Sequence, residues 1–277
     1  MDSHVHIDFF DSKQRDDCIR DALAAGIDYF VVPGVSREKW AQLFEIARRE
    51  NVFFALGEHP LELTDVPENE SRSEILLREI KKTKETRVGR KLVAIGEIGL
   101  DYYHLSTKNL ERREIQRRAF REQLFAAVEE KLPAIIHCRD KDGSVDAWND
   151  ANSIITECEI SPKDVLFHSF SYGPEQVKKW CECGGYVSIS GTITKPNAQE
   201  IRAALPFIPR EKMLIETDSP FLLPHALRIA GKEQPANEPK NVVEVARFVG
   251  EILGKDKWEI LSQTRENGLR FFHINRQ

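Results

Sequence analysis

Hydrophobic positions along the chain follow two alternating patterns. Short runs rich in β-branched and aromatic residues predict strands, whereas apolar positions spaced three and four apart predict amphipathic helices. The segment EKWAQLFEIARREN is typical of the second pattern, because Trp40, Leu43, Phe44 and Ala47 fall on one helical stripe. The runs that predict strands cover residues 4–9, 29–33, 52–57, 92–97, 134–137, 165–168, 186–190 and 213–216.

The alternation of strands with helices predicts an α/β fold with a parallel sheet. Eight such units in 277 residues match a single (β/α)8 TIM-type barrel. A doubly wound open sheet is the alternative. No linker rich in proline, serine or glycine divides the chain, so we expect one domain over residues 1–277.

Polar side chains gather where the predicted strands end. In a barrel of this type the active site forms at the C-terminal ends of the strands. Six of the eight histidines fall at or just past such an end, whereas scattered structural histidines would not concentrate there. The residues at these ends are His4, His6, Glu58, His59, Glu97, Asp101, His137, Arg139, Asp140, His168, Glu216, Asp218 and His225.

The first run contains two histidines one residue apart, in SHVHID. If the run is a strand, His4 and His6 point to the same face, and Val5, Ile7 and Phe9 point to the other. Two neutral imidazoles side by side suggest a metal site. An H-x-H pair also arises by chance, so further ligands at other strand ends have to support it.

Composition restricts the partners and the compartment. Hydrophobic residues make up 41% and charged residues 31%, with a net charge of −5. Such a chain offers no broad positive field, so a nucleic acid would have to be held by a local patch or by metal ions. We expect no signal peptide, no membrane span and no membrane partner. The odd number of cysteines, five, favours reduced thiols and an intracellular protein, cytoplasmic or nuclear.

Eight motifs in chain order carry a resemblance to a known family. The motifs are DSHVHID, GEHP, AIGEIGLDYY, IIHCRD, HSFSYG, YVSISG, IETDSP and NEPKNV. With them, from Ser3 to about Leu269, the chain resembles the TatD family of metal-dependent deoxyribonucleases, which are amidohydrolase-like barrels. One motif departs from the family pattern, because HCFSG reads HSFSYG here, with Tyr172 before the glycine.

The resemblance implies a site with two divalent metal ions. His4 and His6 match the ligands of the first ion, and Glu97 matches the carboxylate that bridges both ions. His137 and His168 match the ligands of the second ion. Imidazoles and carboxylates suit Mg²⁺, Mn²⁺ or Zn²⁺, and no thiolate is needed. We expect these side chains to converge in one pocket.

Asp218 matches the family aspartate beside the first ion and the attacking water. As a carboxylate it can accept the proton of that water, so we expect Asp218 and Glu97 to be catalytic. His59 and Arg139 are expected to contact phosphate oxygens of the substrate. A salt bridge from Arg139 to Asp140 or Asp142 is the alternative.

Asp101 is expected to hold a histidine ligand in its tautomer. The alternative is a cap of a turn or helix after the fourth predicted strand. Tyr102 and Tyr103, which follow it, could stack on a base or pack under a loop.

The resemblance implies that the protein is a deoxyribonuclease, a metal-dependent hydrolase that acts on the phosphodiester bonds of DNA. An acidic protein should make a short contact with DNA, which favours 3′-to-5′ trimming of single strands or frayed ends. A metal-dependent amidase, lactonase or phosphotriesterase is the first alternative. A non-catalytic scaffold that keeps metal for stability is the second. A monomer is favoured slightly over an oligomer.

Overall fold

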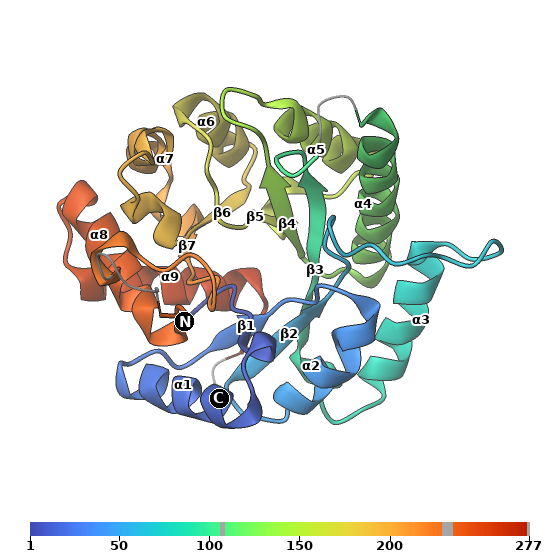
Figure 1. The fold of residues 1–277 in the computed structure, drawn as a ribbon, viewed down its shortest axis with the longest axis horizontal. Coiled ribbons are helices and arrows are strands. Elements are labelled where there is room, and N and C mark those ends of the chain that lie inside the picture. The colour runs from blue at the N-terminus through green and yellow to red at the C-terminus, as the bar shows by residue number, and fades with distance from the viewer. Residues whose placement is uncertain (106–108, 229–234, 276–277) are drawn as a thin grey trace. The chain divides into compact units, whose positions relative to one another are not determined.

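The computed structural model describes residues 1–105, 109–228 and 235–275, which form two compact units. One unit is Pro33–Phe167, and the other joins Met1–Val32 to His168–Gln277. In Figure 1 the first unit runs from light blue to green, and the second contains the dark blue and the yellow to red parts. The single domain over residues 1–277 stays a prediction.

The unit Pro33–Phe167 is built on four parallel strands: β2 (Val52–Leu56), β3 (Leu92–Asp101), β4 (Ala134–Arg139) and β5 (Val165–Phe167). Each strand pairs with the next one along the chain, and a helix lies in each connection. In Figure 1, α4 and α5 run beside β3 and β4, on which they pack. The helices of this unit are α2 (Trp40–Ile46), α3 (Arg72–Lys84), α4 (Leu110–Glu130) and α5 (Asp146–Glu157), with 3-10 turns η2 (Arg37–Lys39), η3 (Gly89–Lys91) and η4 (Pro162–Asp164).

Close contact joins the residue after β2 to the middle of β3. A Cβ atom on Gly57 would lie 2.6 Å from the carbonyl carbon of Gly96, and one on Gly96 would lie 2.7 Å from the Cβ of Ile135, so neither position tolerates a side chain. Every residue of both strands is buried, as in parallel sheets that are covered on both faces. The residues that follow these glycines, Glu58 and Glu97, are therefore held in a rigid frame.

The other unit contains β1 (Phe30–Val32), β6 (Tyr186–Ile189) and β7 (Met213–Ile215). Strands β6 and β7 are parallel neighbours. Helix α9 packs on β7 and on α8. The helices are α1 (Ser12–Ala24), α6 (Pro174–Glu182), α7 (Gln199–Ala204), α8 (Val242–Leu253) and α9 (Lys257–Phe271), with 3-10 turns η1 (Ile7–Phe9), η5 (Gly191–Thr194), η6 (Leu205–Phe207), η7 (Arg210–Lys212), η8 (His225–Leu227) and η9 (Pro239–Asn241).

The first predicted strand, residues 4–9, is wrong as a strand. Asp2 forms an isolated parallel bridge to Phe30, and the amide of Val5 donates to the carbonyl of Val31. On the other side, the amide of Ser3 donates to the carbonyl of Ile215 at the end of β7. Residues 2–5 thus lie between β1 and β7.

The chain then leaves this position because the amide of His6 donates to the carbonyl of Ser219, and η1 begins at Ile7. The expectation that Val5, Ile7 and Phe9 share one face of a strand also fails, because Val5 and Ile7 are fully buried, whereas Phe9 is 45% exposed. The described residues therefore form seven strands, an α/β arrangement with parallel pairing, and the full eight-stranded barrel stays a prediction. Among these residues, none of the helices has the length and apolar character that crossing a membrane requires.

Candidate metal centre

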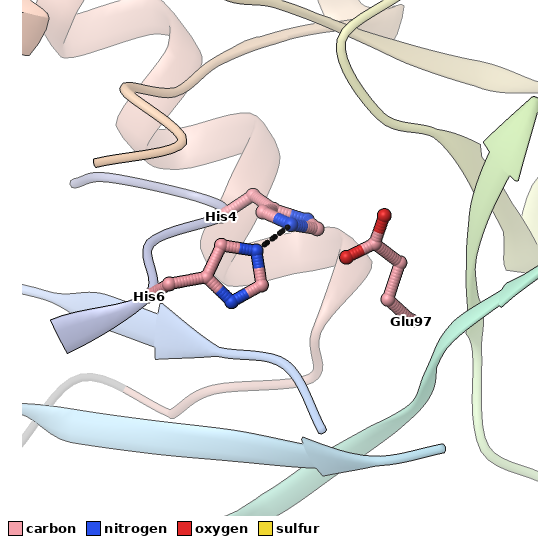
Figure 2. A group of neighbouring side chains, drawn as sticks. All are labelled: His4, His6 and Glu97. Atoms are coloured by element: carbon pink, nitrogen blue, oxygen red, sulfur yellow. Dashed lines mark hydrogen bonds between the residues drawn. The ribbon is translucent and has the colours of Figure 1, made fainter. Parts of the chain in front are cut away.

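Three side chains of the unit that contains the N-terminus meet at the end of β7. The Nε2 atoms of His4 and His6 lie 3.2 Å apart and face each other, as Figure 2 shows. Oδ1 of Asp218 lies 3.6 Å from the Nε2 of His4 and 3.2 Å from the Nε2 of His6. Both histidines are buried, whereas the side chain of Asp218 is 14% exposed.

The spacing of these three atoms fits one divalent ion. Ligands about 2.0–2.1 Å from a tetrahedral ion lie roughly 3.3 Å from one another, close to the three distances between His4, His6 and Asp218. An ionised carboxylate beside two imidazole nitrogens also suits a cation, since it supplies negative charge and the imidazoles supply lone pairs. We call these three residues the His4–His6–Asp218 group.

The backbone holds Asp218 in an unusual conformation. Its φ is 54°, in the left-handed region that residues other than glycine adopt rarely. The amide of Asp218 donates to the carbonyl of His4 at 3.0 Å, which ties the two ligands together. The preceding Thr217 donates from its amide and its hydroxyl to the buried carboxylate of Asp2. Strain of this kind persists where the surroundings enforce it, which is common at functional sites.

Burial alone would raise the pKa of Asp218. The hydrogen bond from His6 and the charges of His6, His4 and His168 outweigh burial and lower the pKa below its usual range. Asp218 is therefore ionised at neutral pH, which is the form that binds a cation and accepts a proton.

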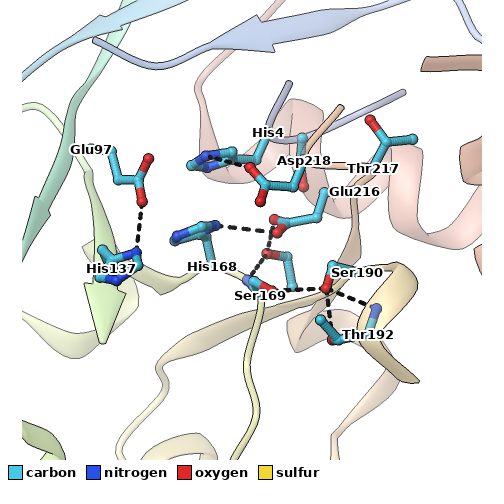
Figure 3. Close-up of polar contacts among 12 residues, drawn as sticks. His4, Glu97, His137, His168, Ser169, Ser190, Thr192, Glu216, Thr217 and Asp218 are labelled. Atoms are coloured by element: carbon cyan, nitrogen blue, oxygen red, sulfur yellow. Dashed lines mark hydrogen bonds and ion pairs between the residues drawn. The ribbon is translucent and has the colours of Figure 1, made fainter. Parts of the chain in front are cut away.

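His168 joins the same unit from the end of β5 and stacks on His4. The two rings are nearly parallel, with centroids 3.9 Å apart and planes 9° apart. The Nδ1 of His168 lies 3.2 Å from Oε1 of Glu216, as Figure 3 shows. The other oxygen of Glu216 accepts a hydrogen bond from Ser188, and the glutamate is fully buried. Glu216 thus fixes the orientation of the His168 ring.

The departure from the family motif after His168 lies in a packed segment. Ser169 has a φ of 43°, and its hydroxyl shares a hydrogen bond with Ser190 that continues to Thr192 (Figure 3). Tyr172 is buried and packs edge-on against Phe170, with ring centroids 5.7 Å apart. The additional tyrosine therefore serves the packing of this loop.

The unit Pro33–Phe167 contains a second group of potential ligands. The Nδ1 of His137 lies 2.8 Å from Oε1 of Glu97, as Figure 3 shows, and its Nε2 lies 3.1 Å from Oδ2 of Asp101. The amide and ring of His104 also contact Asp101. Burial acts on Asp101, but its hydrogen bonds with His137 and His104 and the charge of His137 prevail and lower its pKa well below the usual range.

An ionised Asp101 determines which nitrogen of His137 can bind metal. The Nε2 of His137 must carry a proton to donate to that carboxylate. In the neutral ring the lone pair of Nδ1 then points toward the carboxylate of Glu97. Because both groups are acceptors they repel each other, and a cation bound between them would remove this repulsion. This is the carboxylate–histidine–metal arrangement expected for Asp101. The alternative of a turn cap also applies, since Asp101 accepts from the amide of His104.

His59 lies beside the same carboxylate but presents a donor. Its Nε2 lies 3.4 Å from Oε1 of Glu97, a spacing that a metal ligand would also show. However, its Nδ1 accepts a hydrogen bond from the amide of Leu61 at 3.2 Å. A neutral imidazole whose Nδ1 accepts carries its proton on Nε2, so His59 cannot offer that nitrogen to a metal. The expected role as a donor to phosphate oxygens agrees better with this tautomer.

Arg139 extends from the end of β4 at the surface. Its guanidinium carbon lies 4.0 Å from the centroid of the Tyr103 ring. Asp140 accepts hydrogen bonds from the amides of Ala147 and Trp148 in α5. Arg139 is exposed, and the alternative salt bridge from Arg139 to Asp140 or Asp142 stays a prediction. Contact with substrate phosphate stays a prediction.

The sequence comparison decides the family. Residues 1–273 match the model of the family described as TatD related DNase. The chain belongs to the TatD family.

Curated relatives of this TatD chain match it along nearly the whole length. An uncharacterized metal-dependent hydrolase, YabD, from Bacillus subtilis is 32% identical, and the match covers 99% of both chains. The 3′-5′ ssDNA/RNA exonuclease TatD from Salmonella typhimurium is 30% identical, with 95% of this chain and 94% of the relative covered. The chain is thus a metal-dependent hydrolase that acts on ester bonds, as the family and these relatives indicate.

A solved structure resembles the TatD chain closely. The crystal structure of YjjV, a TatD homolog from Escherichia coli, has a TM-score of 0.81 and 26% identity, and the match covers 99% of this chain and 98% of the other. The TatD-like α/β fold predicted from the sequence motifs is therefore confirmed.

The structure places predicted ligands of this TatD chain in two groups, one in each unit. The structure groups His4, His6 and Asp218 in one unit, and Glu97 and His137 in the other, as expected ligands would be. Convergence of the six predicted ligands in one pocket and the bridge by Glu97 stay predictions. The role of Glu216 was missed, although its place at the end of a strand was a signal. The roles of the ligands themselves also stay predictions.

Proposed function

We propose that this chain is a metal-dependent nuclease that hydrolyses DNA phosphodiester bonds and trims single strands or frayed ends from 3′ to 5′. The observation that carries the proposal is the triangle of ligand atoms in the His4–His6–Asp218 group, whose distances suit one divalent ion. The TatD family supports a nuclease, and a relative with the name of a 3′-5′ ssDNA/RNA exonuclease supports the direction and the single strand.

In this proposal the chain binds two divalent ions, Mg²⁺, Mn²⁺ or Zn²⁺. His4, His6 and Asp218 hold the first ion, and His137 takes part in holding the second. The contributions of His168 to the second ion and of Glu97 to both come from the family resemblance. When bound, such ions lower the pKa of a water molecule and neutralise charge on a phosphoryl oxygen.

The protein side chains then have separate roles. Asp218, which is ionised, orients the attacking water and accepts its proton. The Nε2–H of His59 and the guanidinium of Arg139 donate to phosphate oxygens and position the scissile bond. Asp101 keeps His137 in the tautomer whose Nδ1 lone pair is available.

The proposal is tested with chelator-treated protein and a 5′-labelled single-stranded oligonucleotide. We expect no cleavage without metal and a 3′-shortened ladder after addition of Mg²⁺, Mn²⁺ or Zn²⁺. His6→Ala should bind one ion fewer by elemental analysis and lose most of its activity. His273→Ala is the matched control, because that histidine lies beyond α9 and belongs to neither ligand group.

The turnover of a lactone, an amide, a phosphotriester and closed circular duplex DNA is measured with the same protein preparations. Full nuclease activity in metal-free protein would refute the metal-dependent mechanism. Preferred turnover of one of the neutral substrates would replace the nuclease by the corresponding hydrolase. Cleavage of closed circles as fast as of single-stranded ends would refute trimming from an end.

A further inference from the structure

Two exposed phenylalanine rings lie beside the His4–His6–Asp218 group. Phe9 is the last residue of η1 and is 45% exposed, and Phe221 follows β7 and is 47% exposed. Both positions belong to the same compact unit as His6. An exposed aromatic ring is common on a protein surface, but two that meet over a buried polar group need a reason.

The rings of Phe9, Phe221 and His6 form a three-membered edge-to-face cluster. The two phenylalanine centroids are 5.4 Å apart with planes at 74°. The His6 centroid lies 5.6 Å from Phe9 and 5.9 Å from Phe221, with planes at 77° and 70°. His6 is 4% exposed, so it forms the inner corner and the phenylalanines form the outer edge.

Backbone hydrogen bonds tie both rings to predicted metal ligands. The amide of Phe9 donates to the carbonyl of His6 at 3.1 Å. The amide of Phe221 donates to the carbonyl of Asp218 at 2.8 Å. The segments that place the ligands therefore also fix the backbone positions from which the two rings extend.

This placement would bring a nucleobase next to the ligand group. A base stacked on either ring would lie beside His6, whose ring centroid is 5.6 Å from that of Phe9 and 5.9 Å from that of Phe221. A net charge of −5 gives the chain no overall positive field to attract DNA, so a short contact must obtain affinity from another source. Stacking on an aromatic ring supplies it for any base, because every base has a π face.

We propose that Phe9 and Phe221 form a stacking platform for an unstacked base of the nucleotide that adjoins the scissile phosphodiester. The ligand is thus the end of a single strand, in which the terminal base is not covered by a paired neighbour. The proposal rests on the nuclease function proposed above and adds what selects the strand end. The platform positions the substrate and takes no part in proton transfer.

The test compares two substrates that differ in the terminal bases alone. One is a single-stranded oligonucleotide with ordinary bases, and the other has the same length but abasic sites at its last two 3′ positions. Phe9→Ala and Phe221→Ala should each raise KM for the ordinary strand by about 5- to 150-fold, the range expected for one stacked base, with a smaller change in kcat. Neither substitution should change KM for the abasic-ended strand. Phe221→Tyr should retain the wild-type KM, because it keeps the ring.

Phe207→Ala is the matched control. Phe207 is also 45% exposed in the same unit, but it precedes β7, whereas Phe221 follows it. Its ring contacts Lys178, whose Nζ lies 3.7 Å from the centroid. We expect Phe207→Ala to leave KM unchanged for both strands. Thermal unfolding of all four variants verifies that each is folded.

Binding is measured separately from cleavage, with 2-aminopurine at the 3′ end, whose fluorescence falls when it stacks. The platform would be overturned, and the nuclease proposal left intact, by either of two results. One is an equal rise in KM for the ordinary and the abasic-ended strand, and the other is an unchanged KM in both alanine variants. If the protein binds and quenches the terminal base without cutting the strand, and the alanine variants do not quench it, the platform holds and the nuclease proposal fails. Absence of both binding and cleavage overturns both.

Discussion

The tautomers of three histidines decide what each can do in the site. His137 donates from Nε2 to an ionised aspartate, which leaves Nδ1 available as a ligand. His59 accepts at Nδ1 and thereby presents a donor at Nε2. His168 is held at Nδ1 by a fully buried glutamate. Chemically identical residues at strand ends thus receive different roles from single hydrogen bonds.

Asp218→Asn tests the role of proton acceptor at this scale. The amide keeps the shape of the side chain but removes the charge and the basicity, so we expect kcat to fall about 10²- to 10⁴-fold. KM for a single-stranded oligonucleotide should change little, because the contacts to phosphate lie on other residues. Steady-state kinetics with elemental analysis of bound metal separates loss of the base from loss of an ion.

The control is Asp16→Asn, which makes the same substitution of asparagine for aspartate at an exposed position of α1. Near-normal turnover by Asp218→Asn with a full complement of metal would exclude Asp218 as the base.

At the scale of elements, α4 supports the loop around His59 and the end of β3. Gln123 donates to the carbonyl of Glu58 and accepts from its amide, at 3.1 Å and 2.7 Å. Gln116 donates to the carbonyl of Pro60 and accepts from the amide of Asp101. Both glutamines are buried, so the loops before and after His59 and the end of β3 are fixed by one helix.

Gln123→Ala should destabilise the protein because it leaves two buried backbone groups without their partner. We expect the free energy of unfolding to fall by about 2–6 kcal/mol, from about 1–3 kcal/mol for each of the two unsatisfied groups. Urea unfolding followed by circular dichroism measures it. Gln199→Ala, at an exposed position of α7, should change stability by less than about 0.5 kcal/mol. Equal stability of the two variants would contradict the supporting role.

The loop after β3 is attached to α5 through Tyr102. Its hydroxyl donates to Asp150 at 2.6 Å, and burial together with this hydrogen bond raises its pKa well above the usual value of 10.0. Above pH 10 the unfolded chain loses this proton while the folded chain keeps it, so stability should fall as pH rises, by up to about 1.4 kcal/mol per pH unit.

Tyr102→Phe should cost about 1 kcal/mol at pH 7 and should show a shallower loss of stability from pH 9 to 11 than the wild type. Urea titrations at several pH values measure the difference. Identical slopes for the two proteins would show that Tyr102 does not hold its proton more tightly in the folded state.

For the whole molecule, metal binding and stability should be linked. A ligand that binds only the folded state raises the free energy of unfolding by RT ln(1 + [L]/Kd), which is about 2.7 kcal/mol at a hundredfold excess over Kd. Chelator treatment should therefore lower Tm, and Mn²⁺ or Zn²⁺ should restore it. His6→Ala should lose part of this response and His273→Ala should retain it, as differential scanning calorimetry would show. A Tm that is insensitive to metal in the wild type would exclude tight binding.

The sequence by itself determined the parallel α/β pattern, the strands other than the first, and the residue types at their ends. It could do so because buried parallel strands require continuous apolar runs and because polar side chains that close such runs share one edge of the sheet. The family motifs then identified His4, His6, Glu97, His137, His168 and Asp218 as predicted ligands.

Only the tertiary structure decided the parts that depend on contacts between distant segments. Residues 4–9 have a strand-like pattern, but the hydrogen bond from His6 to Ser219 ends the extended segment and turns Phe9 outward. The tautomer of His59 depends on the amide of Leu61, and the orientation of His168 depends on Glu216. A pattern of residue types records which side chains are apolar or ionisable, but donors and acceptors are assigned by their partners, and these are brought together only by the fold.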